Sequence, residues 1–236
     1  MIELKEVSKN FGLTHALNNV NLKLGSEQCI GLIGPNACGK TTMIKSILSI
    51  VVPTAGDILI DGKSIKNDVS YKSLIGYMPQ IGRYPENMSI GQVVDMIKSI
   101  RNNEQVLDLE LWDAFNLDSM KDKKMHALSG GTIQKVSATI AFMFNPKILI
   151  LDEPTAGLDP LASEILRDKI KKERNNGKLI IITSHLLNEL NDVLSHIVFM
   201  EEGKIVFYKD IESLLEETGQ PLISKAISYL LKNLKG

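Results

Sequence analysis

The segment GPNACGKTT at residues 34–42 has residue types and a spacing that suit the binding of phosphate groups. It matches the pattern G-x-x-x-x-G-K-[ST] and follows the apolar stretch CIGLI, which is typical of a buried strand. Backbone N–H groups and the amino end of a following helix attract phosphate oxygens, and the ammonium of Lys40 can reach the outer phosphates. Thr41 can ligate Mg²⁺, and Thr42 can donate to a phosphate. The predicted phosphate-binding residues are Gly34, Pro35, Asn36, Ala37, Cys38, Gly39, Lys40, Thr41 and Thr42.

A second chemical signal is the stretch ILILDE at residues 148–153. Its four aliphatic residues indicate a buried strand, and two carboxylates follow at the carboxyl end. A carboxylate in this place can hold Mg²⁺, and its neighbour can polarise an attacking water molecule. We therefore predict that Asp152 is a metal ligand and that Glu153 is the catalytic base.

The stretch LSGGT at residues 128–132 places a pair of glycines before a helix-like segment. Exposed amides at the positive end of a helix are suited to phosphate. The position of this stretch just before ILILDE resembles the signature of the ATP-binding cassette (ABC) ATPases. The resemblance implies that Ser129, Gly130, Gly131 and Thr132 bind nucleotide.

The resemblance to ABC ATPases extends over nearly the whole chain and implies further roles. Phe11 is similar to the aromatic residue that stacks on adenine, and Gln80 to the glutamine that senses Mg²⁺ and the attacking water. Asp159 in AGLD resembles the acid of the loop that lines the partner subunit. His185 in ITSH matches the histidine that contacts the γ-phosphate. Together with Lys40 and Glu153, Gln80 and His185 form the expected catalytic set, and Thr41, Gln80 and Asp152 the expected Mg²⁺ ligands.

Three positions of the nucleotide motifs need comment. Ala37 stands where the family usually has glycine, and a positive φ there would carry a strain of about 1 kcal/mol. Thr132 stands where the family usually has glutamine. Threonine keeps a hydroxyl but has a shorter reach, so the family's glutamine contact with a partner subunit is not carried over to this position. Cys38 has two interpretations: a thiol near a helix amino end can be oxidisable, or it can serve as a small residue in the loop. We favour the second.

The bulk composition bounds the class of protein. The 236 residues are 44% hydrophobic and 23% charged, and the formal net charge is −1, so charge gives no reason to expect a nucleic-acid partner. The two cysteines lack the spacing of a metal or redox motif and suit a reducing compartment. No signal-peptide stretch opens the sequence, and no apolar run approaches the ~18 residues that span a bilayer. We therefore expect a cytoplasmic protein, and the resemblance implies that it is peripheral on the inner face of the cell membrane through a permease subunit.

Hydrophobic periodicity indicates the elements that position these motifs. Alternating apolar residues predict strands near residues 2–4 and 20–24, the period from 89 to 117 is helical, and LIIIT at 179–183 predicts a further strand. With the resemblance, this predicts an α/β fold: a P-loop NTPase (RecA-like) core with an N-terminal antiparallel β subdomain and an inserted α-helical signature subdomain. We expect the ATPase domain at 1–203, its helical subdomain at about 84–145, and a hairpin end with an amphipathic helix at 204–236.

The resemblance implies a mechanism and partners. Two cassettes, expected to be identical, would pack head to tail around two ATP molecules, closing on ATP and opening on hydrolysis. The expected cofactors are ATP and Mg²⁺, and the expected second partner is an integral-membrane permease subunit, docked near Ile81, Arg83, Tyr84, Pro85 and the helix at 90–100.

Other functions stay open at this point. A soluble ABC ATPase that remodels a non-transport complex, such as one of iron–sulfur assembly, is the main alternative. A P-loop kinase or GTPase would have no need of LSGG. Within transporters, MPQIGRYPENMSI and the segment from LSGGT to ASEIL look like the ATPase of the copper-linked system that matures nitrous oxide reductase (the NosF-like group).

Overall fold

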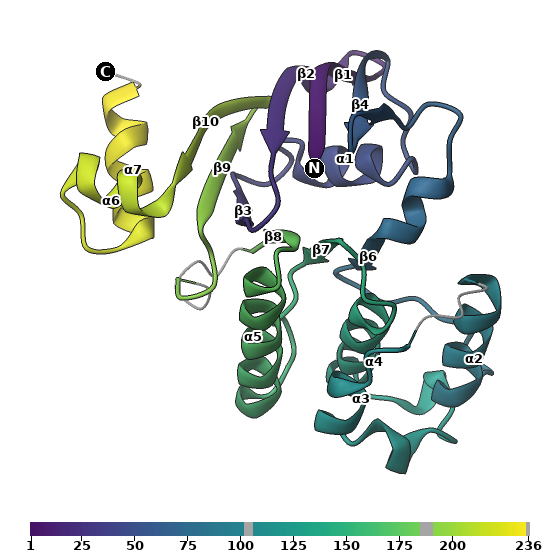
Figure 1. Ribbon diagram of the computed structural model, residues 1–236. Coiled ribbons are helices and arrows are strands. Elements are labelled where there is room, and N and C mark those ends of the chain that lie inside the picture. The colour runs from purple at the N-terminus through teal and green to yellow at the C-terminus, as the bar shows by residue number, and fades with distance from the viewer. Residues whose placement is uncertain (102–105, 185–190, 235–236) are drawn as a thin grey trace. The chain divides into compact units, whose positions relative to one another are not determined.

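The computed structural model describes residues 1–101, 106–184 and 191–234 (Figure 1). The chain divides into two compact units, one made of residues 1–72 and 179–236 and the other of residues 73–178. The domain boundaries expected at residues 84, 145 and 203 stay predictions. No helix among the described residues is long and apolar enough to cross a membrane.

The first unit contains the antiparallel sheet expected at the N-terminus. Its strand order is β2-β1-β4-β5, with bounds β1 (Ile2–Phe11), β2 (Thr14–Leu24), β4 (Ala55–Ile60) and β5 (Lys63–Ser64). Alternation places one face of these strands in the core, because Ile2 pairs with Leu24 and Leu4 with Leu22, and all four side chains are buried.

The same unit contains four further strands in the order β10-β9-β3-β8. They are β3 (Cys29–Ile33), β8 (Leu179–Thr183), β9 (His196–Glu201) and β10 (Lys204–Asp210). β3 runs parallel to both of its neighbours, and its continuous apolar sequence suits a strand that is covered on both faces. The chain passes from β3 through residues 34–39 into the helix α1 (Lys40–Ile47). Two helices close the tail, α6 (Ile211–Thr218) and α7 (Ile223–Leu234).

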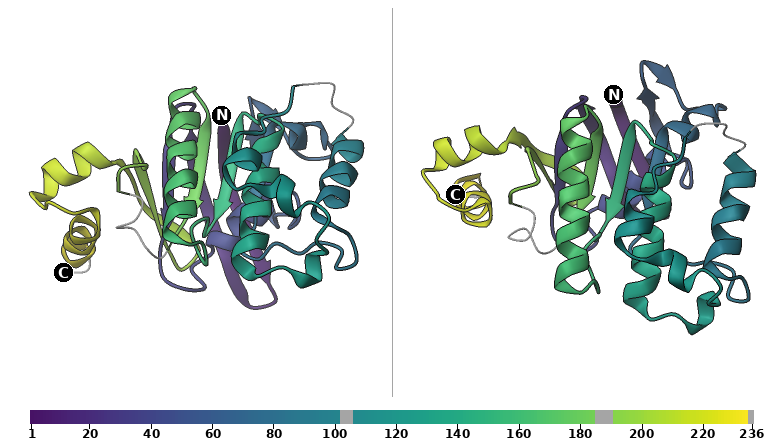
Figure 2. Two further views of the ribbon diagram at one scale, coloured as in Figure 1. Left: turned by 90° about the horizontal axis from the view of Figure 1, so that it is seen from below. Right: turned by 60° about the horizontal axis from the view of Figure 1, so that its bottom comes forward.

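The second unit combines two parallel strands with helices. β6 (Ile75–Met78) pairs with β7 (Ile148–Asp152) in parallel. The helices are α2 (Ile90–Arg101), α3 (Glu110–Ala114), α4 (Gly130–Met143) and α5 (Pro160–Asn175). Short 3₁₀ turns of this unit lie at Leu117–Met120 and Met125–Ala127, and a further one at Ser70–Leu74 begins in the first unit. α2, α3 and α4 lie side by side (Figure 2), joined by a hydrophobic cluster of Val94, Ile97, Leu107, Trp112, Ile140, Met143 and Phe144.

A buried ion-pair network ties α5 to the start of α3. Lys169 on α5 is 3% exposed, and its ammonium lies 2.5 Å from Asp108, 2.7 Å from Glu110 and 2.9 Å from Glu173. Burial alone would lower the pKa of Lys169, but the hydrogen bonds to these carboxylates outweigh it and raise the pKa above its ordinary value. The network therefore fixes α5, whose amino end carries part of the predicted site.

Candidate functional site

The loop between β3 and α1 has a backbone that largely requires glycine. φ is +152° at Gly34 and +110° at Gly39. A Cβ atom would lie 2.1 Å from the carbonyl oxygen of Met200 at the first position and 2.4 Å from that of Ala16 at the second. Ala37 also adopts a positive φ, +61°, so the strain expected from its Cβ atom, about 1 kcal/mol, applies.

This loop exposes the groups that would meet an anion. α1 begins with Gly39 at its N-cap position, and glycine has no side chain that could accept from the first-turn N–H groups. Pro35, Asn36, Ala37 and Thr41 are exposed. The ammonium of Lys40 donates to the carbonyl oxygens of Gly34 at 2.7 Å and Pro35 at 2.9 Å. The arrangement is able to bind phosphate oxygens through backbone amides and one ammonium group.

The thiol of Cys38 is buried. The residue is only 3% exposed, and its carbonyl oxygen accepts a hydrogen bond from the N–H of Gly203 at 3.0 Å. A Cβ atom built on Gly34 would lie 2.7 Å from the Cys38 sulfur, so the thiol packs directly against the loop backbone. This burial favours the interpretation of Cys38 as a space-filling residue.

Phe11 stands at the end of β1, before the turn into β2. Its side chain is 52% exposed, and the ammonium of Lys9 lies 5.0 Å from the centre of its ring. An exposed aromatic face of this kind is able to stack on a planar base.

In the second unit, the predicted metal and base residues follow two aligned strand ends. Met78 of β6 is the register partner of Leu151 of β7, so Gln80 and Glu153 stand two residues beyond one matched pair. Gln80 is exposed, while Asp152 and Glu153 are half-buried. Glu153 has a φ of +51°, an uncommon conformation for a residue with a Cβ atom. Strained backbone of this kind is often found at active sites.

The LSGGT segment begins α4 and is capped by its own serine. The N–H of Thr132 donates to the hydroxyl oxygen of Ser129 at 3.3 Å, and the two hydroxyl groups are 2.9 Å apart. Around Gly130, a Cβ atom would meet no atom within 4 Å, so this amide lies in an open place. At Gly131, a Cβ atom would lie 2.7 Å from the carbonyl oxygen of Gly157. The first glycine leaves space beside the backbone, and the second permits the AGLD loop to approach.

Two residues that the sequence analysis did not single out connect α4 to the predicted site. The side chain of Gln134 is 5% exposed and donates to the carbonyl oxygen of Glu153 at 3.3 Å. Lys135 forms an ion pair of 2.7 Å with Asp159, whose carboxylate also accepts from the N–H of Ala162 and caps α5. The hydrogen bond from Lys135 is the main cause that lowers the pKa of Asp159. The available signal was a polar pair within an otherwise apolar helical segment.

Within each unit the predicted residues gather at chain segments that suit their roles. The first unit holds residues 34–42 and Phe11, and the second holds Gln80, residues 129–132 and the residues from Asp152 to Asp159. His185 lies outside the described residues.

Comparison with known proteins identifies the chain. The sequence model of the ABC transporter family matches residues 17–156, which include the loop at 34–42, LSGGT and ILILDE. The chain belongs to the ABC transporter family. This cassette is 31% identical over 224 residues to the Bacillus subtilis protein YhaQ, an uncharacterized ABC transporter ATP-binding protein, and the match covers 93% of the cassette and 74% of YhaQ. The resemblance inferred from the motifs is therefore confirmed.

Solved structures agree on the fold. The structure of an ATP-binding subunit of an ABC transporter matches 98% of the cassette and 99% of that subunit, with a TM-score of 0.89 and 23% identity. A dimeric post-hydrolysis state of the ATP-binding cassette MJ0796, bound to ADP and Pi, matches 89% of the cassette and 99% of that chain, with a TM-score of 0.79 and 24% identity. The P-loop NTPase fold expected from the sequence is confirmed. The cassette is an ABC ATPase.

Proposed function

We propose that this cassette works in pairs to drive a membrane transporter, each cassette completing the nucleotide site of the other. The observation that carries the proposal is the second anion-binding segment in one chain. In addition to a full phosphate loop, the chain has the capped start of α4, with the open amide at Gly130. A second cassette would give this segment a function, because its amides could then bind the ATP held at the phosphate loop of the first cassette.

The phosphate loop at residues 34–42 would bind ATP. Its amides and the ammonium of Lys40 would neutralise the β- and γ-phosphates, Thr42 would donate to a phosphate, and the exposed ring of Phe11 would stack on adenine. These contacts bind the substrate without selecting what is transported, so they predict nothing about the cargo.

The residues assigned to Mg²⁺ have the chemistry that this ion requires. Thr41, Gln80 and Asp152 offer a hydroxyl, an amide and a carboxylate oxygen, and Mg²⁺ prefers oxygen ligands and few protein carboxylates. Among the described residues no group of three or more His, Cys, Asp or Glu side chains is placed to hold a metal ion. The site proposed at Thr41, Gln80 and Asp152 would leave the remaining ligand positions of Mg²⁺ to substrate phosphates and water. When bound, Mg²⁺ would neutralise the charge that develops on the phosphates.

Glu153 is assigned the role of general base. It lies directly after β7 and has a positive φ. Its carboxylate would accept a proton from the attacking water. Gln80 would orient the same water. The resemblance gives His185 the contact with the γ-phosphate, and this role stays a proposal.

The proposed pair is a two-fold symmetric dimer in which Ser129, Gly130, Gly131 and Thr132 of one cassette meet the ATP of the other. ATP then joins the two surfaces, and hydrolysis replaces one linked anion by two that repel each other. Asp159 would lie at the same interface, and its ion pair with Lys135 connects this interface to α4.

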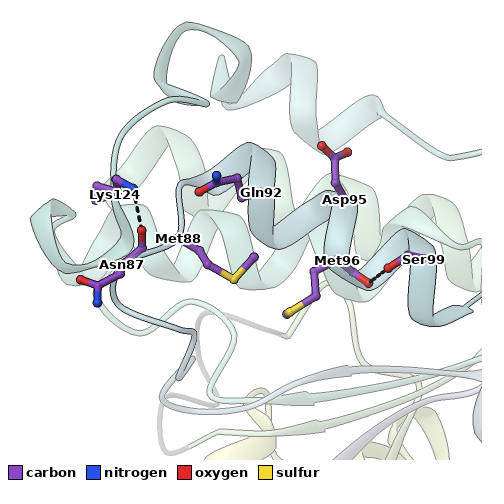
Figure 3. A pocket seen from close by; sticks show the side chains of 7 residues that line it. All are labelled: Asn87, Met88, Gln92, Asp95, Met96, Ser99 and Lys124. Atoms are coloured by element: carbon purple, nitrogen blue, oxygen red, sulfur yellow. Dashed lines mark hydrogen bonds between the residues drawn. The ribbon is translucent and has the colours of Figure 1, made fainter.

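A groove on the helical part of the second unit supports docking of a permease. It has a volume of about 640 Å³ and is lined by Asn87, Met88, Gln92, Asp95, Met96, Ser99 and Lys124. Figure 3 shows the side chains of Met88 and Met96 lying on one side of α2. Methionine side chains adapt to irregular apolar partners. Ile81, which is 68% exposed, belongs to the loop that the resemblance also assigns to docking. Association with the membrane would then occur through the permease.

Co-purification tests the transporter proposal. A tagged cassette isolated from detergent-solubilised membranes should carry a protein with several membrane-spanning helices. Met96→Lys should weaken that association, while Leu222→Lys, at a position that is 41% exposed on the other unit, should not. Recovery of a soluble scaffold instead would favour the iron–sulfur alternative, which the comparisons do not favour.

The narrower NosF-like assignment concerns only the cargo. It rests on the amino-acid sequences of residues 78–90 and 128–166, and the comparisons above do not support a copper-linked system. Identification of the co-purified permease would decide it, because the cassette has no contact with the cargo.

A further inference from the structure

The first unit contains a pocket that none of the nucleotide motifs uses. It has a volume of about 390 Å³ and lies between the carboxyl end of α1, the loop that follows it, β4 and the segment after β5. Its lining residues are Ser46, Ser49, Val51, Val52, Pro53, Asp57, Ile58, Ile65, Lys66, Asn67, Asp68 and Val69. This volume is within the range of small-molecule sites, about 300–1,000 Å³.

Apolar side chains form both the inner wall and the mouth of this pocket. Ile58 is 1% exposed and Ile65 is 7% exposed, so the wall belongs to the core. Val52 and Val69, in contrast, are 74% and 70% exposed. Exposed aliphatic side chains beside a hollow are a feature of ligand-binding surfaces, because an apolar occupant would remove them from water.

One polar group in the wall lacks a partner. Ser46 is fully buried, and its hydroxyl oxygen makes no hydrogen bond in the described part of the chain. The hydroxyl of Ser49, in the same wall, lies 2.7 Å from the hydroxyl of Tyr71 and is satisfied. Since buried polar groups are nearly always hydrogen-bonded, the Ser46 hydroxyl suits a partner supplied from the pocket.

The charges of the pocket favour a cation over an anion. Two carboxylates, Asp57 and Asp68, line it with one ammonium, that of Lys66. Lys66 forms an ion pair of 3.9 Å with Asp57, which also accepts hydrogen bonds from the Ser64 hydroxyl and the Ile58 N–H. Asp68 is the second carboxylate, so the lining carries one more negative than positive group. Asp68 accepts a hydrogen bond from Ser70 that lowers its pKa, which keeps this carboxylate ionised at neutral pH.

We propose that this pocket binds a small molecule that has an aromatic or branched apolar body and one ammonium group. The body would cover the valines and isoleucines, and the ammonium would meet the two carboxylates and the Ser46 hydroxyl. Ser46 belongs to α1, the helix that begins at Lys40, so the bound molecule would touch the far end of the helix that leaves the phosphate loop.

Three probes with the same phenyl body and different polar groups test the chemistry. They are 2-phenylethylamine, 2-phenylethanol and phenylacetate, titrated into the full chain and followed by amide NMR. We expect saturable shifts of the amides of Ser46, Val52 and Val69, with a millimolar dissociation constant for the amine, which is typical of so small a ligand. The amine should bind more tightly than the alcohol, and the acid should bind at least tenfold more weakly. Equal binding of amine and acid, or no saturable shift at these amides, overturns the proposal.

Matched variants locate the binding. Val69→Lys places a cation at the exposed mouth and should abolish binding of 2-phenylethylamine, whereas Val106→Lys, at a valine that is 92% exposed elsewhere, should leave it unchanged. Ser46→Ala should weaken binding about fivefold to tenfold, while Ser49→Ala should not, because only the first hydroxyl needs a partner. Circular dichroism melting curves confirm that each variant is folded. Unchanged binding by Val69→Lys overturns the proposal.

Discussion

The side-chain amide of Gln134 donates a hydrogen bond of 3.3 Å to the backbone carbonyl of Glu153. Glu153 has a positive φ, and Gln134 is almost fully buried. The glutamine therefore holds the proposed base in a backbone conformation that it would not adopt without support. It also joins the helix that begins with the LSGGT segment to the residue that would activate water.

We expect Gln134→Met to lower kcat without a matching change in the KM for ATP. Methionine keeps the volume of glutamine but cannot donate, and loss of one such hydrogen bond, about 1–2 kcal/mol, corresponds to a fivefold to thirtyfold lower kcat. Steady-state ATPase rates, measured over a range of Mg·ATP concentrations, give both constants. A change confined to KM, or wild-type kinetics, would show that Gln134 does not position Glu153.

Replacing Glu153 with glutamine should separate binding from hydrolysis. The amide cannot accept the proton of water, so we expect turnover to fall by a factor of about 10²–10⁴ while ATP affinity is retained. An ATP-dependent dimer should then accumulate, which light scattering after gel filtration measures. Glu202→Gln is a matched control, because Glu202 also has a positive φ, +48°, but belongs to a hairpin turn. A fully active or strictly monomeric Glu153→Gln variant would refute the assignment.

The ion pair between Lys135 and Asp159 predicts a pH effect. The pKa of Asp159 is lowered in the folded chain, so the stabilising contact is fully present above the ordinary pKa of a carboxyl group. This contact is lost as the pH falls through the lowered pKa of Asp159. Lys135→Met should raise the pKa of Asp159 toward its ordinary range, as followed by NMR titration of the carboxyl carbon.

Asp210 is the control for this titration. It caps α6 by accepting from the N–H of Ser213 at 2.8 Å, and the bonds from Ser213 are the main cause of its own lowered pKa. Its titration should be the same in both proteins. If the pKa of Asp159 does not move in Lys135→Met, the ion pair is absent in solution.

Ala37→Gly should stabilise the chain slightly. Glycine removes the Cβ strain at a φ of +61°, but it loses more backbone entropy on folding, so the net gain is about 0.5 kcal/mol. For a chain of this length we expect a rise in Tm of about 1–2 °C in thermal unfolding. Ala156→Gly, at an exposed position without a positive φ, should instead lower Tm. A lower Tm for Ala37→Gly would mean that the methyl group contributes packing that outweighs the strain.

Local patterns predicted the elements around the motifs because strand, loop and helix follow each other directly there. At the start of the helical segment predicted from residue 89, the hydroxyl of Ser89 accepts from the N–H of Gln92, and the N–H of Ser89 donates to the side chain of Gln92. α5 begins at Pro160, directly after the cap residue Asp159 of the AGLD segment. The helix α6 was not predicted, because an eight-residue helix offers few turns in which a period can be recognised.

The contacts of Gln134 and Lys135 could not be predicted in the same way. Their partners are 19 and 24 residues away, and only the tertiary fold brings α4 to the end of β7. The same holds for the close approach of Gly131 to Gly157, which is a property of two loops. Sequence patterns thus indicated which residues carry the chemistry but not which residues hold them in place.

The ammonium of Lys40 donates to three acceptors of its own loop: the carbonyl oxygens of Gly34 and Pro35, and the sulfur of Cys38 at 3.7 Å. A nucleotide bound as proposed would compete with these acceptors for the cation, so its affinity would reflect an exchange of hydrogen bonds rather than their creation. When the nucleotide leaves, the cation would return to acceptors that are already within reach.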